Sequence, residues 1–152
     1  RRVVDQLGSY REIVWQKVND PDGEVGYMLR FFPATAELGE KIVAALRAEG
    51  VGCGMRGPQA GPDWHTYSYM FPVILKAAAA AGHSPFNDPR YLDRGGQVEY
   101  HRGDCPMADD LHDRNVIVRI DPGWTADDCD DVARAINKVL GAICTAAAGQ
   151  PR

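Results

Sequence analysis

The hydrophobic pattern changes period along the first third of the chain. Apolar and polar side chains alternate over residues 13–17, a dense turn signal follows at residues 19–23, and residues 27–32 are again rich in aromatic and apolar side chains. Two strand-like segments around such a turn predict a β-hairpin. Before it, residues 1–7 place Val3, Val4 and Leu7 on one side of a helical turn, which indicates the end of a helix.

A helical period replaces the alternation after the hairpin. Residues 35–49 carry Leu38, Ile42, Val43 and Leu46 at helical spacing. Thr35 is expected to cap the start of this helix, and Gly50 is expected to stop it. A short strand over residues 51–55 is expected to follow and to return to the sheet of the hairpin.

The middle of the chain holds little regular pattern. Residues 56–62 contain two glycines and two prolines, which predicts a loop. Residues 82–103 form a second long irregular segment with Pro85 and Pro89. Between them, residues 73–81 are alanine-rich enough to predict a short helix after the interruption at Pro72. Long irregular segments in a compact domain often carry function.

Regular patterning resumes in the last third. Pro106 suits the first position of a helix that runs to about His112, and residues 115–120 alternate as a strand. Thr125 followed by Asp128 resembles a capping box. It opens a helix whose expected apolar face consists of Val132, Ala135, Ile136, Val139 and Leu140.

This order of elements predicts an α+β fold, with a small and mainly antiparallel sheet of about four strands covered by helices. We expect one domain over residues 1–145 and a flexible tail over residues 146–152. The chain opens on Arg1 within helical sequence, so we expect that residue 1 is not the native start.

Composition narrows the class of protein. The chain has 152 residues, 45% of them hydrophobic and 25% charged, which is enough apolar material for a core and excludes a disordered tail or a disulfide mini-protein. The net charge of −4 argues against a general nucleic-acid partner. No apolar run approaches the roughly 20 residues that cross a bilayer, so we expect no membrane partner.

Four cysteines, Cys53, Cys105, Cys129 and Cys144, lack the spacing of a zinc site. We expect reduced thiols in a cytoplasmic protein and no metal. His112 with its neighbouring aspartates fits a helix surface better than a metal site, and Asp20 and Asp22 around Gly23 fit a plain turn better than a calcium loop.

Several segments, read in order, resemble the C-terminal small domain of the DegT/StrS family of PLP-dependent aminotransferases. The similarity covers residues 1–140 and depends on the order and spacing of the segments rather than on one specific motif. The matching stretches are Val-Asn-Asp-Pro-Asp-Gly at 18–23, Ala-Leu-Arg-Ala-Glu-Gly-Val at 45–51, Trp-His-Thr-Tyr at 64–67, Gly-Asp-Cys-Pro-Met-Ala-Asp-Asp-Leu at 103–111 and Trp-Thr-Ala-Asp-Asp at 124–128.

The resemblance implies a fold-type I enzyme that transaminates keto sugars or aminocyclitol precursors, which are small-molecule substrates. In this family PLP is held by a large domain that would precede residue 1, and the complete enzyme is a homodimer. We therefore expect the partner of this chain to be that large PLP-binding domain or subunit. The small domain would pack on it and close the substrate side.

The same resemblance places substrate-contacting side chains on the segment at 54–69, where Arg56, His65 and Tyr67 are the candidates. Arg56 could hold a hydroxyl-rich or anionic group, His65 could orient a hydroxyl, and Tyr67 is as easily a core residue. Tyr100 and His101, with Arg102 beside them, form a second candidate cluster. Each also fits a purely structural role: a surface arginine, a hydrogen-bonded histidine, or ordinary loop polarity.

PLP transamination needs a lysine for the Schiff base. The four lysines, Lys17, Lys41, Lys76 and Lys138, all lie outside the family's Schiff-base context. We therefore expect no catalytic residue, no PLP and no transaminase activity in this chain alone. An alternative of another class is a stand-alone, non-catalytic binding or regulatory domain derived from the small domain.

A domain that packs on a larger one is expected to expose an apolar surface. The candidates for the two sides of the sheet are Trp15, Phe31, Phe32, Tyr69, Met70 and Phe71. Burial of all six within the chain would favour the stand-alone alternative.

Overall fold

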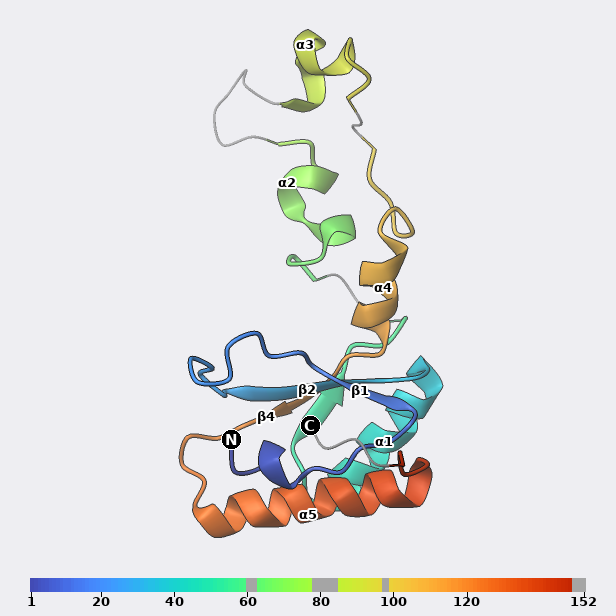
Figure 1. The fold of residues 1–152 in the computed structure, drawn as a ribbon. Helices are drawn as coiled ribbons and strands as arrows, with labels where there is room; N and C mark the ends of the chain where they lie inside the picture. Colours follow the sequence, from blue (N-terminus) through green and yellow to red (C-terminus); the bar gives the residue numbers. More distant parts are fainter. Residues whose placement is uncertain (60–62, 78–84, 97–98, 149–152) are drawn as a thin grey trace. The chain divides into compact units, whose positions relative to one another are not determined.

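The computed structural model describes residues 1–59, 63–77, 85–96 and 99–148, and the chain divides into two compact units. Unit 1 comprises Arg1–Gln59 and Asp110–Arg152, and unit 2 comprises Ala60–Asp109. Figure 1 traces the chain through both units by colour.

Unit 1 begins with a short turn and the expected hairpin. A 3-10 turn, η1 (Val4–Gln6), stands where the pattern predicts a helix end. Strands β1 (Ile13–Trp15) and β2 (Met28–Pro33) then pair antiparallel. In the loop between them, Oδ1 of Asp20 accepts the N–H groups of Asp22 and Gly23 at 3.2 Å each, an Asx turn that reverses the chain.

Helix α1 (Ala36–Ala48) confirms the predicted helix and both of its ends. Oγ1 of Thr35 accepts the N–H of Leu38 at 3.2 Å, as an N-cap does. Gly50 has φ +84°, a left-handed conformation that favours glycine at a helix end. Strand β3 (Cys53–Met55) follows directly.

The sheet has the strand order β1-β2-β4-β3, and every neighbouring pair is antiparallel. The segment at 51–55 thus joins the predicted sheet, but it pairs with β4 (Val116–Arg119) and not with a hairpin strand. This confirms the α+β class and the four-stranded antiparallel sheet. The long closing helix α5 (Ala126–Ile143) begins with the predicted capping box of Thr125 and Asp128.

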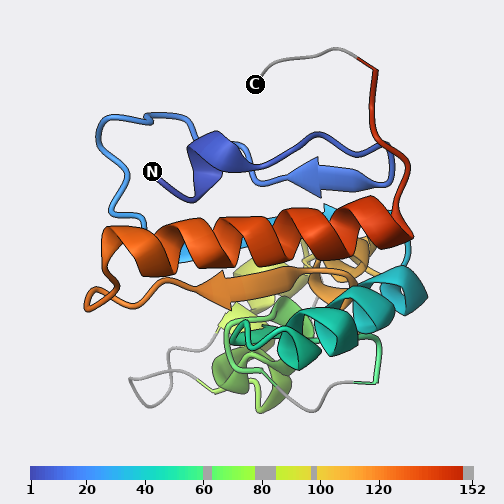
Figure 2. The same ribbon diagram turned by 90° about the horizontal axis from the view of Figure 1, so that it is seen from below.

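Helices α1 and α5 cover the same face of the sheet (Figures 1 and 2). Side chains alternate along each strand, so one set meets the helices and the other set forms an outward face. The covered face and the helices share a core that is completely shielded from solvent at its centre. Its fully buried members include Phe31, Ile42, Leu46, Val116, Val118, Ile136 and Leu140.

The segment after α5 returns to the beginning of unit 1. Tyr10 and Ala146 form an antiparallel bridge, and the N–H of Arg11 donates to the carbonyl of Thr145 at 2.9 Å. Residues 149–152 of the predicted tail lie outside the described residues.

Unit 2 is built from short helical turns. These are η2 (Tyr67–Tyr69), α2 (Phe71–Ile74), η3 (Pro85–Asn87) and α3 (Pro89–Leu92). Helix α4 (Pro106–Asp113) then carries the chain into unit 1 and agrees with the helix predicted from Pro106 to about His112.

Two predictions for unit 2 are wrong. The helix expected over residues 73–81 instead begins at Phe71 and includes Pro72 in its first turn, because a proline is compatible with the start of a helix. Residues 78–84 lie outside the described residues. The segment expected to be irregular contains η3 and α3, and Asp88 caps α3 by accepting the N–H of Arg90 at 2.9 Å.

Of the six aromatic and apolar side chains expected on the two sides of the sheet, only three belong to it. Trp15 and Phe31 lie against the core with ring centroids 5.3 Å apart, and Phe32 lies on the outward face by alternation with the buried Phe31. The other three belong to unit 2 and not to the sheet, because the chain forms helical turns there.

Among the described residues, no helix combines the length and the apolar composition needed to cross a bilayer.

Candidate functional site

Arg56 lies in unit 1, directly after β3, and lines a groove along β3 and the end of β4. The groove has a volume of about 780 Å³, within the range of small-molecule sites. Its lining comprises Gly52, Cys53, Gly54, Met55, Arg56, Ile117, Arg119, Ile120, Asp121, Pro122 and Trp124. The predicted arginine is therefore accompanied by a second arginine and a tryptophan that sequence reasoning did not select.

Tyr67 lies at the centre of a hydrogen-bond network in unit 2. Its hydroxyl donates to Oδ2 of Asp109 at 2.9 Å and accepts the N–H groups of Gly103 at 3.1 Å and Cys105 at 3.2 Å. The N–H of Gly103 also reaches Oδ2 of Asp109 at 2.8 Å. The hydroxyl thus uses its proton and both lone pairs within the chain.

The environment of Tyr67 favours the protonated phenol. Partial burial raises the pKa of Tyr67, and the hydrogen bond to Asp109 acts in the same direction. Asp109 is only 7% exposed and is the one buried carboxylate among the described side chains. Tyr67 consequently holds the loop at residues 103–105 against the start of α4, and this role needs no ligand.

His65 is exposed, with 96% of its side chain accessible to solvent. Its Nδ1 lies 3.1 Å from Oδ1 of Asp63, which also accepts the backbone N–H of His65 at 2.9 Å. This is a local turn contact. It leaves most of the imidazole accessible to a ligand or to solvent.

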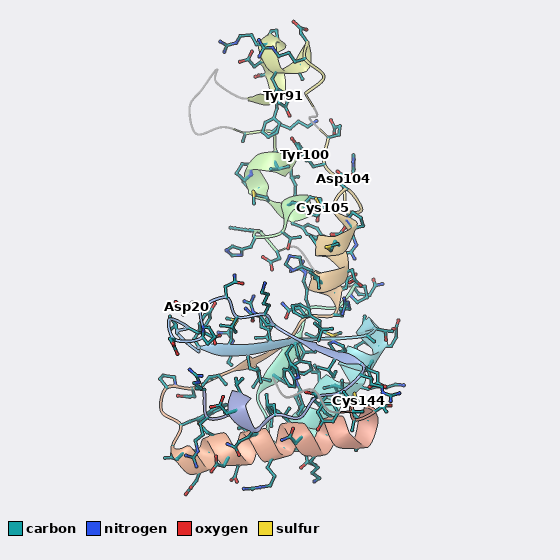
Figure 3. All side chains as sticks on the ribbon, viewed as in Figure 1. Asp20, Tyr91, Tyr100, Asp104, Cys105 and Cys144 are labelled. Atoms are coloured by element: carbon teal, nitrogen blue, oxygen red, sulfur yellow. The ribbon has the colours of Figure 1, made fainter. Side chains whose placement is uncertain are left out.

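Tyr100 lies within a small aromatic group of unit 2. The rings of Phe86 and Tyr100 meet edge to face with centroids 6.4 Å apart. A hydrogen bond with the hydroxyl of Tyr91 raises the pKa of Tyr100. Both tyrosines are labelled in Figure 3.

His101 is exposed, and its backbone belongs to a tight turn. Its N–H donates to Oδ2 of Asp104 at 2.7 Å, and the N–H of Asp104 returns to the carbonyl of His101 at 3.1 Å. Asp104 and the neighbouring Cys105 are labelled in Figure 3. This turn leads into the loop that Tyr67 holds.

The five predicted residues divide between the two units. Arg56 belongs to unit 1, and His65, Tyr67, Tyr100 and His101 belong to unit 2. Within unit 2, the hydroxyl of Tyr67 and the backbone of His101 both form hydrogen bonds with the loop that follows His101.

A comparison with protein-family models and a comparison with curated proteins both returned no match.

The part of the chain that the structure describes contains no group of three histidine, cysteine, aspartate or glutamate side chains close enough to hold a metal ion. All four cysteines are free. Burial raises the pKa of Cys53 and of Cys144, which disfavours the reactive thiolate there.

The sequence analysis selected neither Arg119 nor Asp109, and only Arg119 carries a usable local signal. Arg119 alternates with Val116 and Val118 along β4, which predicts that it faces away from the core. Asp109 has no such local signal. Its partner Tyr67 is 42 residues away, and a buried carboxylate cannot be distinguished from a helix-surface aspartate without that contact.

Proposed function

We propose that this chain is the substrate-side small domain of a PLP-dependent aminotransferase of the DegT/StrS type. The complete enzyme would be a cytoplasmic homodimer that acts on keto sugars or aminocyclitol precursors. Support comes from the segments in which the sequence resembles that family and from the helix-backed antiparallel sheet that the resemblance implies.

The observation that carries the proposal is the exposure of apolar side chains in unit 2. Its buried side chains, among those described, are the polar Thr66 and Asp109. The exposed apolar side chains of this unit include Trp64, Met70, Phe71, Ile74, Leu75, Leu92 and Met107. Exposed apolar surface of this kind is typical of a segment that packs against another domain or subunit.

The residues of this chain do not fit PLP. All four lysines are exposed, and Lys76 and Lys138 form ion pairs with Glu99 and Glu49. None of the four lines the groove beside Arg56. A Schiff-base lysine must have its amine directed into a site that also holds the cofactor, so we assign the imine chemistry to the large domain.

The role left for this chain is to pack on the large domain and help close the substrate site. The candidates for substrate contact are Arg56 in unit 1 and His65, Tyr100 and His101 in unit 2. Tyr67 would act by holding the loop at residues 103–105.

A second candidate function is a stand-alone binding or regulatory domain. It is favoured by the closed core of unit 1, in which the side chains of Phe31, Leu46 and Ile136 are completely buried without help from any other chain. Such a core is compatible with independent folding of unit 1.

The deciding experiment uses the native protein that contains this sequence. It is treated with borohydride, which fixes any PLP Schiff base covalently, and the modified peptide is located by mass spectrometry. We expect one modified lysine outside residues 1–152. Absence of bound PLP in the native protein supports the stand-alone alternative, and modification of Lys17, Lys41, Lys76 or Lys138 contradicts both candidates.

A further inference from the structure

Two glycines, Gly52 and Gly54, lie in the floor of the groove beside Arg56. Gly52 and Gly54 flank Cys53, whose side chain packs against the core, so both glycines belong to the outward face of β3. A Cβ atom at Gly52 would meet no atom within 4 Å. The backbone of the strand is therefore accessible at the bottom of the groove.

Three arginines lie in or beside this groove. Arg56 follows β3 and Arg119 ends β4, and both line the groove. Arg47 of α1 reaches the edge of β3, where its Nε donates to the carbonyl of Cys53 at 3.0 Å. Its Nη2 lies 3.7 Å from the position that a Cβ of Gly54 would occupy.

Arginines outnumber carboxylates in the lining of the groove. Asp121 is the one carboxylate in the lining, and its Oδ1 already accepts the N–H of Gly123 at 2.8 Å. Arg119 is exposed, and within the described ranges it forms no ion pair. A cationic groove on a chain of net charge −4 favours an anionic ligand.

The remaining lining is apolar and includes an aromatic ring. Trp124 follows β4 at the turn into α5, and Ile117 and Met55 lie along the strands. A tryptophan offers a flat apolar surface to a ring, while guanidinium groups bind carboxylate or phosphate through paired hydrogen bonds.

We propose that this groove binds a small organic oxyanion, in which a carboxylate or phosphate group is attached to a flat ring. Arg119 holds the oxyanion, Arg56 and Arg47 add positive charge beside it, and the ring lies over the glycines against Trp124. The site lies within unit 1. The inference goes beyond the proposed function, because binding at this site requires neither PLP nor a large domain.

The test measures binding to the full chain by isothermal titration calorimetry. The probes are phenyl phosphate and benzoate, with inorganic phosphate as an oxyanion without a ring and phenol as a ring without charge. We expect both ring-bearing anions to bind more tightly than inorganic phosphate or phenol. Equal binding of all four probes, or no binding of the two ring-bearing anions, overturns the proposal.

Variants then locate the site. Arg119→Ala is expected to weaken binding of phenyl phosphate roughly tenfold or more, because it removes a charged hydrogen-bond donor. Gly52→Leu is expected to prevent binding, because the structure has room for a leucine side chain that would occupy the groove. Arg11→Ala is the matched control, since it removes an exposed arginine before β1, at the other edge of the sheet.

Circular dichroism and thermal melting establish that each variant is folded. Unchanged binding by folded Arg119→Ala and Gly52→Leu overturns the proposal. An equal loss in Arg11→Ala also overturns it, because the binding would then reflect net charge alone. None of these outcomes depends on whether the native protein carries PLP, so the failure of this proposal is distinguishable from the failure of the proposed function.

Discussion

The phenolic oxygen of Tyr67 lies 2.9 Å from Oδ2 of Asp109, and both atoms accept the N–H of Gly103. The contact joins the start of η2 to the middle of α4. It fixes a loop in which Gly103 has φ +105°, a conformation that L side chains rarely adopt. Tyr67 is therefore a structural link between two segments of unit 2 that lie far apart in the sequence.

Removal of the Tyr67 hydroxyl should loosen this loop. In Tyr67→Phe the N–H of Cys105 loses its acceptor and Asp109 loses a donor, so we expect the amides of Gly103 and Cys105 to exchange with solvent faster. A buried group left without its partner costs about 1–3 kcal/mol. Hydrogen exchange measured by NMR checks the prediction.

Tyr27→Phe is the control, because Tyr27 is 61% exposed in unit 1. It should leave the exchange of these two amides unchanged. Identical exchange rates in Tyr67→Phe and the wild type would show that the hydroxyl does not hold the loop.

The contrast between unit 1 and unit 2 shows what the sequence can predict. Thr35, Gly50, Thr125 and Asp128 act on neighbouring backbone groups, and each of these ends was predicted correctly because a cap is a local signal. The pairing of β3 with β4 joins residues more than sixty positions apart, and no local pattern specifies it.

In unit 2 the sequence holds one local signal that the prediction did not use, and one contact that no local pattern predicts. Asp88 before Pro89 is a helix start, although the surrounding glycines and prolines suggested an irregular segment. Tyr67 was a candidate for substrate contact, and its hydrogen-bond partner Asp109 could not be found from spacing. Arg56 was selected for its chemistry, whereas its neighbours Arg119 and Trp124 come from the other side of the pairing with β4.

Two helical glycines should respond differently to alanine. A Cβ at Gly39 in α1 would overlap Sδ of Met55, whereas a Cβ at Gly141 in α5 would meet only the hydroxyl oxygen of Tyr10 at 3.9 Å. Alanine stabilises a helix interior by about 0.5–1 kcal/mol relative to glycine. We therefore expect Gly141→Ala to raise the melting temperature and Gly39→Ala to give no such gain.

The clash at Gly39 can be tested by removing its cause. In a Met55→Ala background the Gly39→Ala substitution should recover its stabilising effect, measured as a double-mutant cycle in urea. Additive effects of the two substitutions would mean that Met55 does not limit the space beside Gly39.

Removal of the Thr125 hydroxyl from the capping box of α5 should lower the stability of the fold, whereas a serine at this position should preserve it. Oγ1 of Thr125 accepts the N–H of Asp128 at 3.2 Å, and Oδ2 of Asp128 accepts the N–H of Thr125 at 2.8 Å. Thr125→Ala should lower the free energy of unfolding by about 1 kcal/mol. Thr125→Ser keeps the acceptor and should remain close to the wild type in urea denaturation, and equal losses in the two variants would argue against the cap.

Asp130 should contribute a distinct part of the acid sensitivity of the fold. Its carboxylate accepts hydrogen bonds from Nε and Nη2 of Arg2 at 2.7 and 2.6 Å and from Nε2 of Gln6 at 2.7 Å. These hydrogen bonds, with that from Arg2 the strongest, lower the pKa of Asp130 to about 2. The contact ties η1 and the residues before it to α5.

The sign of the effect follows from the lowered pKa. In the unfolded chain this carboxyl titrates near its ordinary pKa of about 3.9. Above that pH the carboxyl is ionised in both states, and its hydrogen bonds with Arg2 and Gln6 stabilise the folded state. The stabilisation is complete above this value and is lost as the pH falls towards 2. Asp130→Asn should therefore lose stability relative to the wild type at pH 6, and the difference should shrink between pH 4 and pH 2.

Urea denaturation at pH 6, 4, 3 and 2 measures this difference directly. Asp131→Asn is the control, because Asp131 is a neighbouring aspartate of α5 whose ion pair with Arg134 is exposed on both sides. Exposed pairs contribute little to stability, so this variant should follow the wild type at every pH. A gap between Asp130→Asn and the wild type that stays constant from pH 6 to pH 2 would mean that Arg2 and Gln6 do not stabilise the ionised form of Asp130.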